Sequence, residues 1–139
     1  MSVLPITLTI AAACGFMSLW LAFRVIVLRR REKVSIGHAG NDTLHARIRA
    51  HSNFAEYAPL FVILLGLLEL AVGSQSCLWF AGAGFVLARI AHAIGMDRPA
   101  PNAFRIGGVI GTLLLLGGLA CYAIAVAYVD AQPAPAVSG

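Results

Sequence analysis

Charged residues are scarce in this sequence of 139 residues. Only 12% of the residues are Asp, Glu, Lys or Arg, and six of them are acidic. A soluble domain usually has about 25% charged and about 45–50% apolar residues, whereas 60% of this chain is hydrophobic and its mean hydropathy is +0.86. The composition excludes a disordered chain. It also argues against a soluble globule, because the apolar residues would outnumber the positions available for burial.

Cysteine and histidine are too few and too irregularly spaced to indicate a metal or disulfide site. Cys14, Cys77 and Cys121 form no C-x-x-C motif. The four histidines form neither H-E-x-x-H nor a pair at i, i+4 beside a carboxylate. We interpret the cysteines as small apolar residues that fill space within the spans, and we predict no metal site.

Four long apolar stretches occupy most of the chain instead. Each is long enough to cross a hydrocarbon core of about 30 Å as a helix. They predict an all-α integral membrane four-helix bundle in one domain, residues 1–130, with spans at about 3–28, 44–72, 77–96 and 103–129. The first stretch is followed, not preceded, by basic residues, which favours a span over a cleaved signal peptide. The Pro- and Ala-rich segment 131–139 is predicted to be a disordered tail.

The basic residues are distributed unevenly along the chain. All ten surround the first and third connections: Arg24, Arg29, Arg30, Arg31, Lys33, Arg47, Arg49, Arg89, Arg98 and Arg105. The positive-inside rule places these connections in the cytoplasm and both termini outside it. Topology therefore explains the net charge of +4 without a nucleic-acid partner.

The second span carries polar residues on two faces. At 100° per residue, Arg49, Asn53 and Glu56 fall on one stripe, whereas Arg47 and His51 lie on the opposite face. We place the start of this helix near residues 42–43, where Asp or Thr can cap it. Polar groups on two sides need protein neighbours on both, which suggests contacts between protomers. The alternatives are a structural ion pair or a snorkelling arginine for Arg49 and Glu56, and a helix–helix hydrogen bond for Asn53.

Further polar residues occur at the cytoplasmic ends of the last two spans. Arg89 and His92 share a face of the third span, and Arg105 lies in the first turn of the fourth, where a helix terminus with an added cation can hold an anion. Contact with anionic lipid headgroups is the alternative for Arg105. With Arg49, Asn53 and Glu56, these groups suit a small zwitterionic ligand with several carboxylates and an amine. Glycines at 107, 111, 117 and 118 predict close helix packing in the fourth span.

The segment Arg47-Ile-Arg49-Ala-His51-Ser-Asn53-Phe-Ala-Glu56-Tyr57-x-Pro59 resembles the signature R-A-x-x-N-x-x-E-x-x-P of the MAPEG family, the membrane-associated proteins in eicosanoid and glutathione metabolism. The resemblance continues through Ala88-Arg89-Ile-Ala-His92 to Arg105, over roughly residues 5 to 128, and is strongest to the bacterial inner-membrane branch.

The resemblance implies a homotrimer that binds glutathione between protomers near the cytoplasmic face. Glutathione-contacting positions of the family correspond here to Arg49, Asn53, Glu56, Tyr57 and His92, and a first-helix arginine corresponds to Arg29 or Arg30. Arg105 matches the arginine that stabilises the glutathione thiolate. Because only the thiolate is nucleophilic and a free thiol has a pKa near 8.5, a guanidinium at the sulfur would lower that pKa and activate the thiol.

Two departures from the family pattern bear on the activity. Ile106 replaces a serine that follows the arginine in the prostaglandin synthase branch, and Met96 replaces a frequent tyrosine. We therefore expect a glutathione-dependent transferase or peroxidase for hydrophobic electrophiles or lipid hydroperoxides, not a specialised eicosanoid synthase. The alternative is a non-catalytic membrane protein of the same fold that binds glutathione or a lipid-like ligand. A small four-span exporter fits this sequence less well. Such an exporter would be expected to have its intramembrane carboxylate in the first span, and this first span has none.

Overall fold

Four long helices make up nearly all of the chain that the structure describes. The computed structural model describes residues 3–130. In chain order the helices are α1 (Pro5–Glu32), α2 (Asp42–Val72), α3 (Ser76–Met96) and α4 (Ala103–Asp130). All four are long and apolar enough to cross a membrane, which confirms the prediction of an all-α protein with four membrane-length helices. The predicted tail, residues 131–139, lies outside the described residues.

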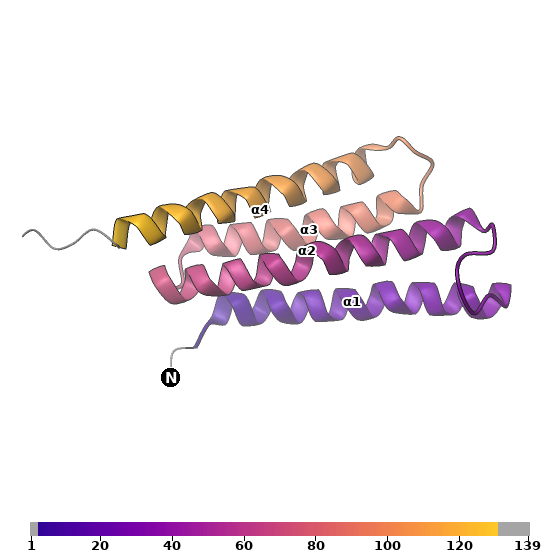
Figure 1. Cartoon of the computed structure of the whole chain (residues 1–139), viewed down its shortest axis with the longest axis horizontal. Coiled ribbons are helices and arrows are strands. Elements are labelled where there is room, and N and C mark those ends of the chain that lie inside the picture. The colour runs from indigo at the N-terminus through magenta and orange to yellow at the C-terminus, as the bar shows by residue number, and fades with distance from the viewer. Residues whose placement is uncertain (1–2, 131–139) are drawn as a thin grey trace, which may run out of the picture.

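The helices run antiparallel to their neighbours in the chain, with α2 and α3 between α1 and α4 (Figure 1). Within residues 3–130, α1 and α4 each pack against both α2 and α3 but not against each other. The α1–α2 and α3–α4 connections lie at the same end of the bundle, and the α2–α3 turn lies at the other (Figure 1). We call the first the basic end, because residues 24–49 and 89–105, which carry all ten basic residues, are at or near it.

A narrow seam of apolar residues holds the helices together. Buried residues recur on α1 and α2 at spacings of three or four, which keeps them on one face of each helix. They are Ile6, Ile10, Cys14, Met17 and Leu21 on α1, and Phe54, Ala58, Phe61, Leu65 and Leu68 on α2. Phe61 stacks on Phe85 of α3 with ring centroids 3.9 Å apart. Outside this seam, large apolar side chains such as Phe16, Phe80 and Leu114 are exposed, as expected for surfaces that face lipid.

Two predicted boundaries at the basic end differ from the structure. The basic run after residue 28 is not a connection but the last turn of α1, which continues to Glu32. Cations are favourable there because the carboxyl end of a helix carries partial negative charge, and Lys33 ends the helix with a left-handed φ of 53°. The cap of α2 is Asn41, whose side chain accepts a hydrogen bond from the Leu44 N–H at 2.9 Å, and not Asp42 or Thr43.

At the opposite end, a buried carboxylate ties α2 to the start of α1. Glu69 is 2% exposed and accepts hydrogen bonds from the N–H groups of Ile6 and Thr7 and from the hydroxyls of Thr7 and Ser74, at 2.6–3.0 Å. Leu4, at the N-cap position of α1, offers no capping side chain, so Glu69 satisfies amides that a helix start leaves unpaired. The carboxylate therefore joins two helices.

Glycine brings α3 and α4 into close contact, but not at all the predicted positions. A Cβ on Gly108 would lie 2.6 Å from the carbonyl oxygen of Ala88, and one on Gly111 would lie 3.3 Å from the Ala88 Cβ. By contrast, Gly107, Gly117 and Gly118 have no neighbour within 4 Å of such an atom in the described chain. The close helix packing predicted for this span therefore occurs at Gly108 and Gly111.

Candidate functional site

Arg89 forms the polar centre of the bundle. Its side chain projects from α3 and is 1% exposed. One terminal nitrogen donates a hydrogen bond to the Asn53 Oδ1 of α2 at 2.7 Å, and the other donates to the Thr112 hydroxyl of α4 at 3.2 Å. The guanidinium carbon lies 6.0 Å from the centroid of the Tyr57 ring. Thus one cation holds three helices together.

No carboxylate forms an ion pair with Arg89 among the described residues, and its Nε has no hydrogen-bond partner there. A buried charge is costly unless it is paired and fully hydrogen-bonded. Asn53 and Thr112 supply the side-chain hydrogen bonds to this guanidinium, and the negative charge of Glu56 also acts on it. This use of Asn53 matches the helix–helix alternative left open by the sequence.

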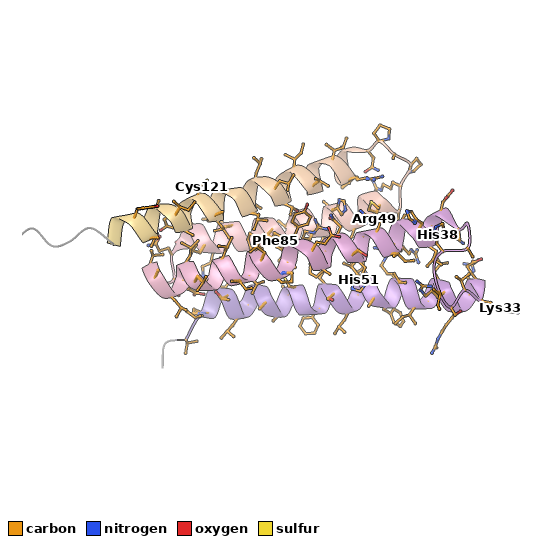
Figure 2. All side chains as sticks on the ribbon, in the orientation of Figure 1. Lys33, His38, Arg49, His51, Phe85 and Cys121 are labelled. Atoms are coloured by element: carbon orange, nitrogen blue, oxygen red, sulfur yellow. The ribbon has the colours of Figure 1, made fainter. Side chains whose placement is uncertain are left out.

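The other two charged candidates of α2 lie on the surface of the single chain. Arg49 and Glu56 are exposed, and neither forms a hydrogen bond or ion pair with another residue of the range 3–130. Figure 2 labels Arg49 toward the end that carries Lys33 and His38. Glu56 is about 20 Å from either end of α2, at a rise of about 1.5 Å per residue. An exposed carboxylate halfway along a membrane-length helix is costly in lipid unless a polar group lies beside it.

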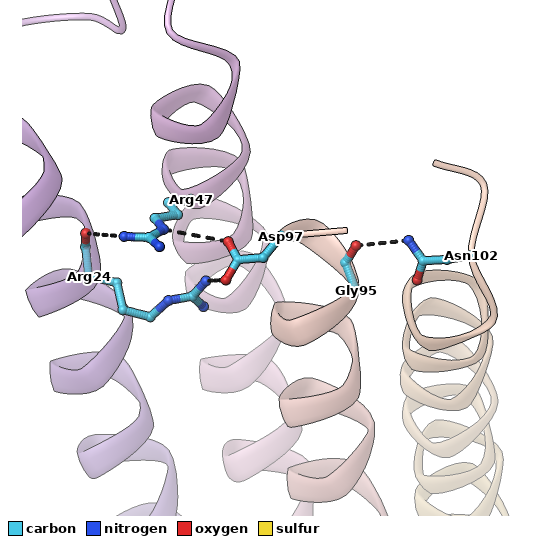
Figure 3. Close-up of polar contacts among 5 residues, drawn as sticks. All are labelled: Arg24, Arg47, Gly95, Asp97 and Asn102. Atoms are coloured by element: carbon cyan, nitrogen blue, oxygen red, sulfur yellow. Dashed lines mark hydrogen bonds and ion pairs between the residues drawn. The ribbon is translucent and has the colours of Figure 1, made fainter. Parts of the chain in front are cut away.

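The predicted second polar face of α2 has its partners within the same chain. Arg47 donates to the carbonyl oxygen of Arg24 on α1 at 3.3 Å, and its Nε lies 3.5 Å from an oxygen of Asp97 (Figure 3). The inference that both polar faces of α2 need neighbouring protomers is therefore wrong for Arg47, because α1 and the end of α3 supply its partners. For Arg49 and Glu56 it stays a prediction.

His92 lies inside the interface between α3 and α4. It is 5% exposed, and its Nδ1 lies 3.4 Å from the carbonyl oxygen of Arg105. Gly108 of α4 packs against its backbone, since a Cβ there would come within 2.6 Å of the His92 nitrogen. In the single chain His92 thus supports the backbone of Arg105.

Arg105 itself is exposed at the start of α4. Beside it lies a shallow hollow of about 300 Å³, lined also by Ala100, Pro101, Ile106, Val109 and Ile110. Apart from the guanidinium, all of these side chains are apolar. The hollow is thus suited to an apolar molecule next to a cation.

Arg29 and Arg30 are separate from these residues in their contacts. They line a hollow of about 320 Å³ with Ile26, Lys33, Val34 and Ser35, and Arg29 donates to the carbonyl oxygen of Ser35 at 3.2 Å. Neither arginine contacts the candidates on α2, α3 or α4 through a hydrogen bond or ion pair within residues 3–130.

The structure thus divides the predicted residues into two groups. Asn53, Tyr57 and His92 lie within the bundle, close to Arg89 or to the α4 backbone. Arg49, Glu56 and Arg105 face outward. The sequence indicated Arg89 as a polar residue of the third span but not its position at the centre of the bundle. Its spacing from Asn53, 36 residues away in the chain, gives no signal of that contact.

Comparison with known proteins identifies the family. The model of the MAPEG family matches residues 7–125, which contain α2 and α3 and most of α1 and α4. This chain belongs to the MAPEG family. The family assignment made from the signature in α2 is thereby confirmed.

Two curated relatives are similar over part of the chain. Both carry the name inner membrane protein YecN, one from Escherichia coli strain K12 and one from Escherichia coli O6:H1 strain CFT073. Each is 27% identical over 77 residues, which cover 55% of this chain and 59% of the relative. The chain thus matches less than two thirds of the length of either relative.

Proposed function

We propose that this MAPEG protein is a glutathione-dependent transferase or peroxidase for hydrophobic electrophiles or lipid hydroperoxides. One observation supports it above all: an exposed arginine, Arg105, lies beside an apolar hollow at the start of a membrane-length helix. The family signature, with Arg49, Asn53 and Glu56 in the spacing of glutathione-contacting positions, supports glutathione as the source of the thiol.

In this proposal Arg105 stabilises the thiolate of glutathione. A guanidinium close to the sulfur favours its charged form, and each unit by which the thiol pKa falls corresponds to about 1.36 kcal/mol. Arg49 and Glu56 would bind the carboxylates and the amine of the tripeptide. Tyr57, His92, and Arg29 or Arg30 are further candidates for its contacts.

Two reactions are consistent with such a site. With a chlorinated nitroaromatic compound, the thiolate attacks the carbon that carries chlorine, a C–S bond forms, chloride leaves and the thiol proton passes to solvent. With a lipid hydroperoxide, two glutathione molecules are oxidised to the disulfide while the hydroperoxide is reduced to an alcohol and water. Either substrate would reach the hollow at Arg105 from the bilayer.

The proposed assembly is a homotrimer with glutathione bound between protomers. The charged groups at Arg49 and Glu56 support an oligomer, because they lack partners within the described chain and one of them is exposed at mid-membrane depth. The number three follows from the family resemblance.

We further propose that the protein lies in a bacterial inner membrane with both termini outside the cytoplasm. The name of the Escherichia coli relatives supports the membrane, and the basic end supports the orientation. Cys77 is exposed at the end opposite the basic one. In a variant that keeps only this cysteine, an impermeant maleimide added to cells with a permeabilised outer membrane should label it. Labelling only after lysis would contradict this orientation.

The test of the activity uses purified protein in detergent or in lipid nanodiscs. We expect saturable binding of glutathione at millimolar concentrations by calorimetry, and turnover of a chlorinated nitroaromatic or of an organic hydroperoxide. Arg105→Ala should reduce turnover at neutral pH by about 10²–10³-fold, the usual loss on removing one group that stabilises developing charge. Arg98→Ala is the matched control, because Arg98 lies in the connection just before α4 and its guanidinium contacts the Phe104 ring.

The outcomes separate the alternatives. No binding at millimolar glutathione would refute the proposal. Binding without turnover across several electrophiles and hydroperoxides would favour the non-catalytic alternative, for which the replacement of two family hydroxyl groups by Ile106 and Met96 is the specific support.

A further inference from the structure

Asp97, the first residue after α3, joins three elements at the basic end. Its carboxylate accepts a hydrogen bond from Arg24 of α1 and forms an ion pair with Arg47 of α2 (Figure 3). The Arg24 side chain is 12% exposed and the Arg47 side chain 27%. Two partly buried cations thus share one carboxylate, which offsets their mutual repulsion. The family signature in α2 begins at Arg49 and does not include this contact.

Asn102 forms the second half of the same connection. Its amide nitrogen donates to the carbonyl oxygens of Gly95 at 2.9 Å and Pro99 at 3.1 Å. Its side-chain oxygen accepts from the Arg105 N–H at 2.9 Å, in the manner of a helix N-cap. One side chain therefore connects the end of α3 to the start of α4, as the dashed line from Asn102 to Gly95 in Figure 3 shows.

The backbone of Arg105 is enclosed as a result. A Cβ on Gly95 would lie 2.3 Å from the Arg105 nitrogen, so no larger residue fits between the two helices there. His92 lies against the Arg105 carbonyl on the other side. The guanidinium itself forms no hydrogen bond or ion pair with any residue of the described range. A fixed backbone thus carries a side chain that is free to bind a ligand.

We propose that Asp97 and Asn102 are positioning residues for Arg105, which they hold where the glutathione thiolate forms. The inference rests on the proposed function. The two residues act in series: Asp97 anchors the end of α3 to α1 and α2, and Asn102 anchors α4 to that end. Neither touches the reacting atoms. A misplacement of about 1 Å can reduce a rate by as much as about 10²-fold, so loosening this connection should affect the thiolate more than the binding of the rest of the tripeptide.

The test compares Asp97→Asn and Asp97→Glu with the unmodified protein in nanodiscs. The pH dependence of kcat and the ultraviolet absorbance of bound thiolate are measured at saturating glutathione. In Asp97→Asn we expect both pH midpoints to rise by about one unit, which corresponds to about tenfold less thiolate at a fixed pH below them, with less than a threefold change in the KM for glutathione. Asp97→Glu keeps the charge, so its two pH midpoints should lie close to those of the unmodified protein.

Two further variants keep the test decisive. Glu32→Gln removes another carboxylate of the basic end, whose one ion pair among the described residues is with Arg31 at 3.8 Å, and it should leave both midpoints unchanged. Asn102→Asp keeps the acceptor for the Arg105 N–H but lacks the donor to Gly95 and Pro99. It should shift the midpoints in the same direction as Asp97→Asn, and it serves if Asp97→Asn does not fold.

An unchanged pH midpoint in a folded Asp97→Asn or Asn102→Asp protein would overturn the inference. A variant that loses thermal stability but keeps the pH midpoint of the unmodified protein would overturn it as well. These results differ from failure of the proposed function. In that case the unmodified protein would itself neither bind glutathione nor turn over any substrate, and both proposals would fall.

Discussion

At the scale of single residues, the molecule depends on a few buried polar groups in an apolar bundle. Arg89 and Glu69 are 1% and 2% exposed, and each connects neighbouring helices through residues that lie 23 to 63 positions apart in the chain. Glu69 accepts four hydrogen bonds, which satisfies its charge. Arg89 has neutral partners and depends on each of them. Polar contacts of this kind select one register between helices that would otherwise slide along apolar surfaces.

The dependence of Arg89 on Asn53 leads to a stability prediction. Asn53→Ala removes a charge-assisted hydrogen bond from a buried guanidinium and should lower the free energy of unfolding by roughly 1–3 kcal/mol. In an Arg89→Met background the same change should cost much less, because the charge is no longer present. Unfolding of the four proteins in detergent, followed by circular dichroism, measures the coupling. Additive effects of the two changes would show that the contact does not contribute to stability.

At the scale of elements, α3 and α4 form the closest pair of helices and carry the start of the proposed site. Gly95 and Gly108 permit the contact, since a side chain at either position would meet the backbone of the other helix. The hollow at Arg105 is lined by the start of α4 and by the connection that precedes it. The position of the guanidinium is therefore determined by helix packing as well as by its own rotamer.

The paired glycines of α4 give a direct test of this packing. Gly108→Ala places a methyl group 2.6 Å from the Ala88 oxygen and should destabilise the protein by about 1–3 kcal/mol, as overpacking does. Gly107→Ala meets nothing within 4 Å and should be neutral or stabilise the helix by up to about 1 kcal/mol. Melting temperatures in detergent distinguish the two. Equal effects would contradict the close α3–α4 contact.

At the scale of the whole molecule, the single chain leaves charged groups on a surface that is otherwise apolar. Leu60 and Ile63 are exposed on α2, close to the exposed carboxylate of Glu56. Lipid can cover these two apolar side chains but not the carboxylate. A second copy of the chain, with glutathione at the junction, would cover both.

The proposed trimer leads to a mass prediction. Native mass spectrometry of the detergent-solubilised protein should give three copies of the 14.6 kDa chain. The double variant Arg49→Leu/Glu56→Leu should change the fraction of the protein that is trimeric, because these side chains lie at the proposed contacts between protomers. Arg31→Leu, at the exposed end of α1, is the control and should leave the mass unchanged. A single copy as the main species of the unmodified protein would contradict the trimer.

The features of this protein that could be predicted from its residues are those that depend on local composition. Apolar runs of membrane length gave the four helices, with errors of a few residues where the basic run continued α1 and where Asn41, not Asp42, caps α2. The family came from the resemblance of the α2 segment to a known signature, and the helices came from the pattern of the residues themselves. These features are predictable because hydrophobic length and helical periodicity are properties of neighbouring residues.

The pairing of the polar residues, by contrast, could not be predicted before the helices were packed together. Asn53 turned out to bind Arg89, and Arg47 to share Asp97 with Arg24, although these partners are 36 to 73 residues apart. Periodicity assigns a side chain to a face of its helix but not to the helix that packs against that face. That choice follows from where glycines allow close approach and where a buried charge finds donors and acceptors, and it exists only once four helices are packed together.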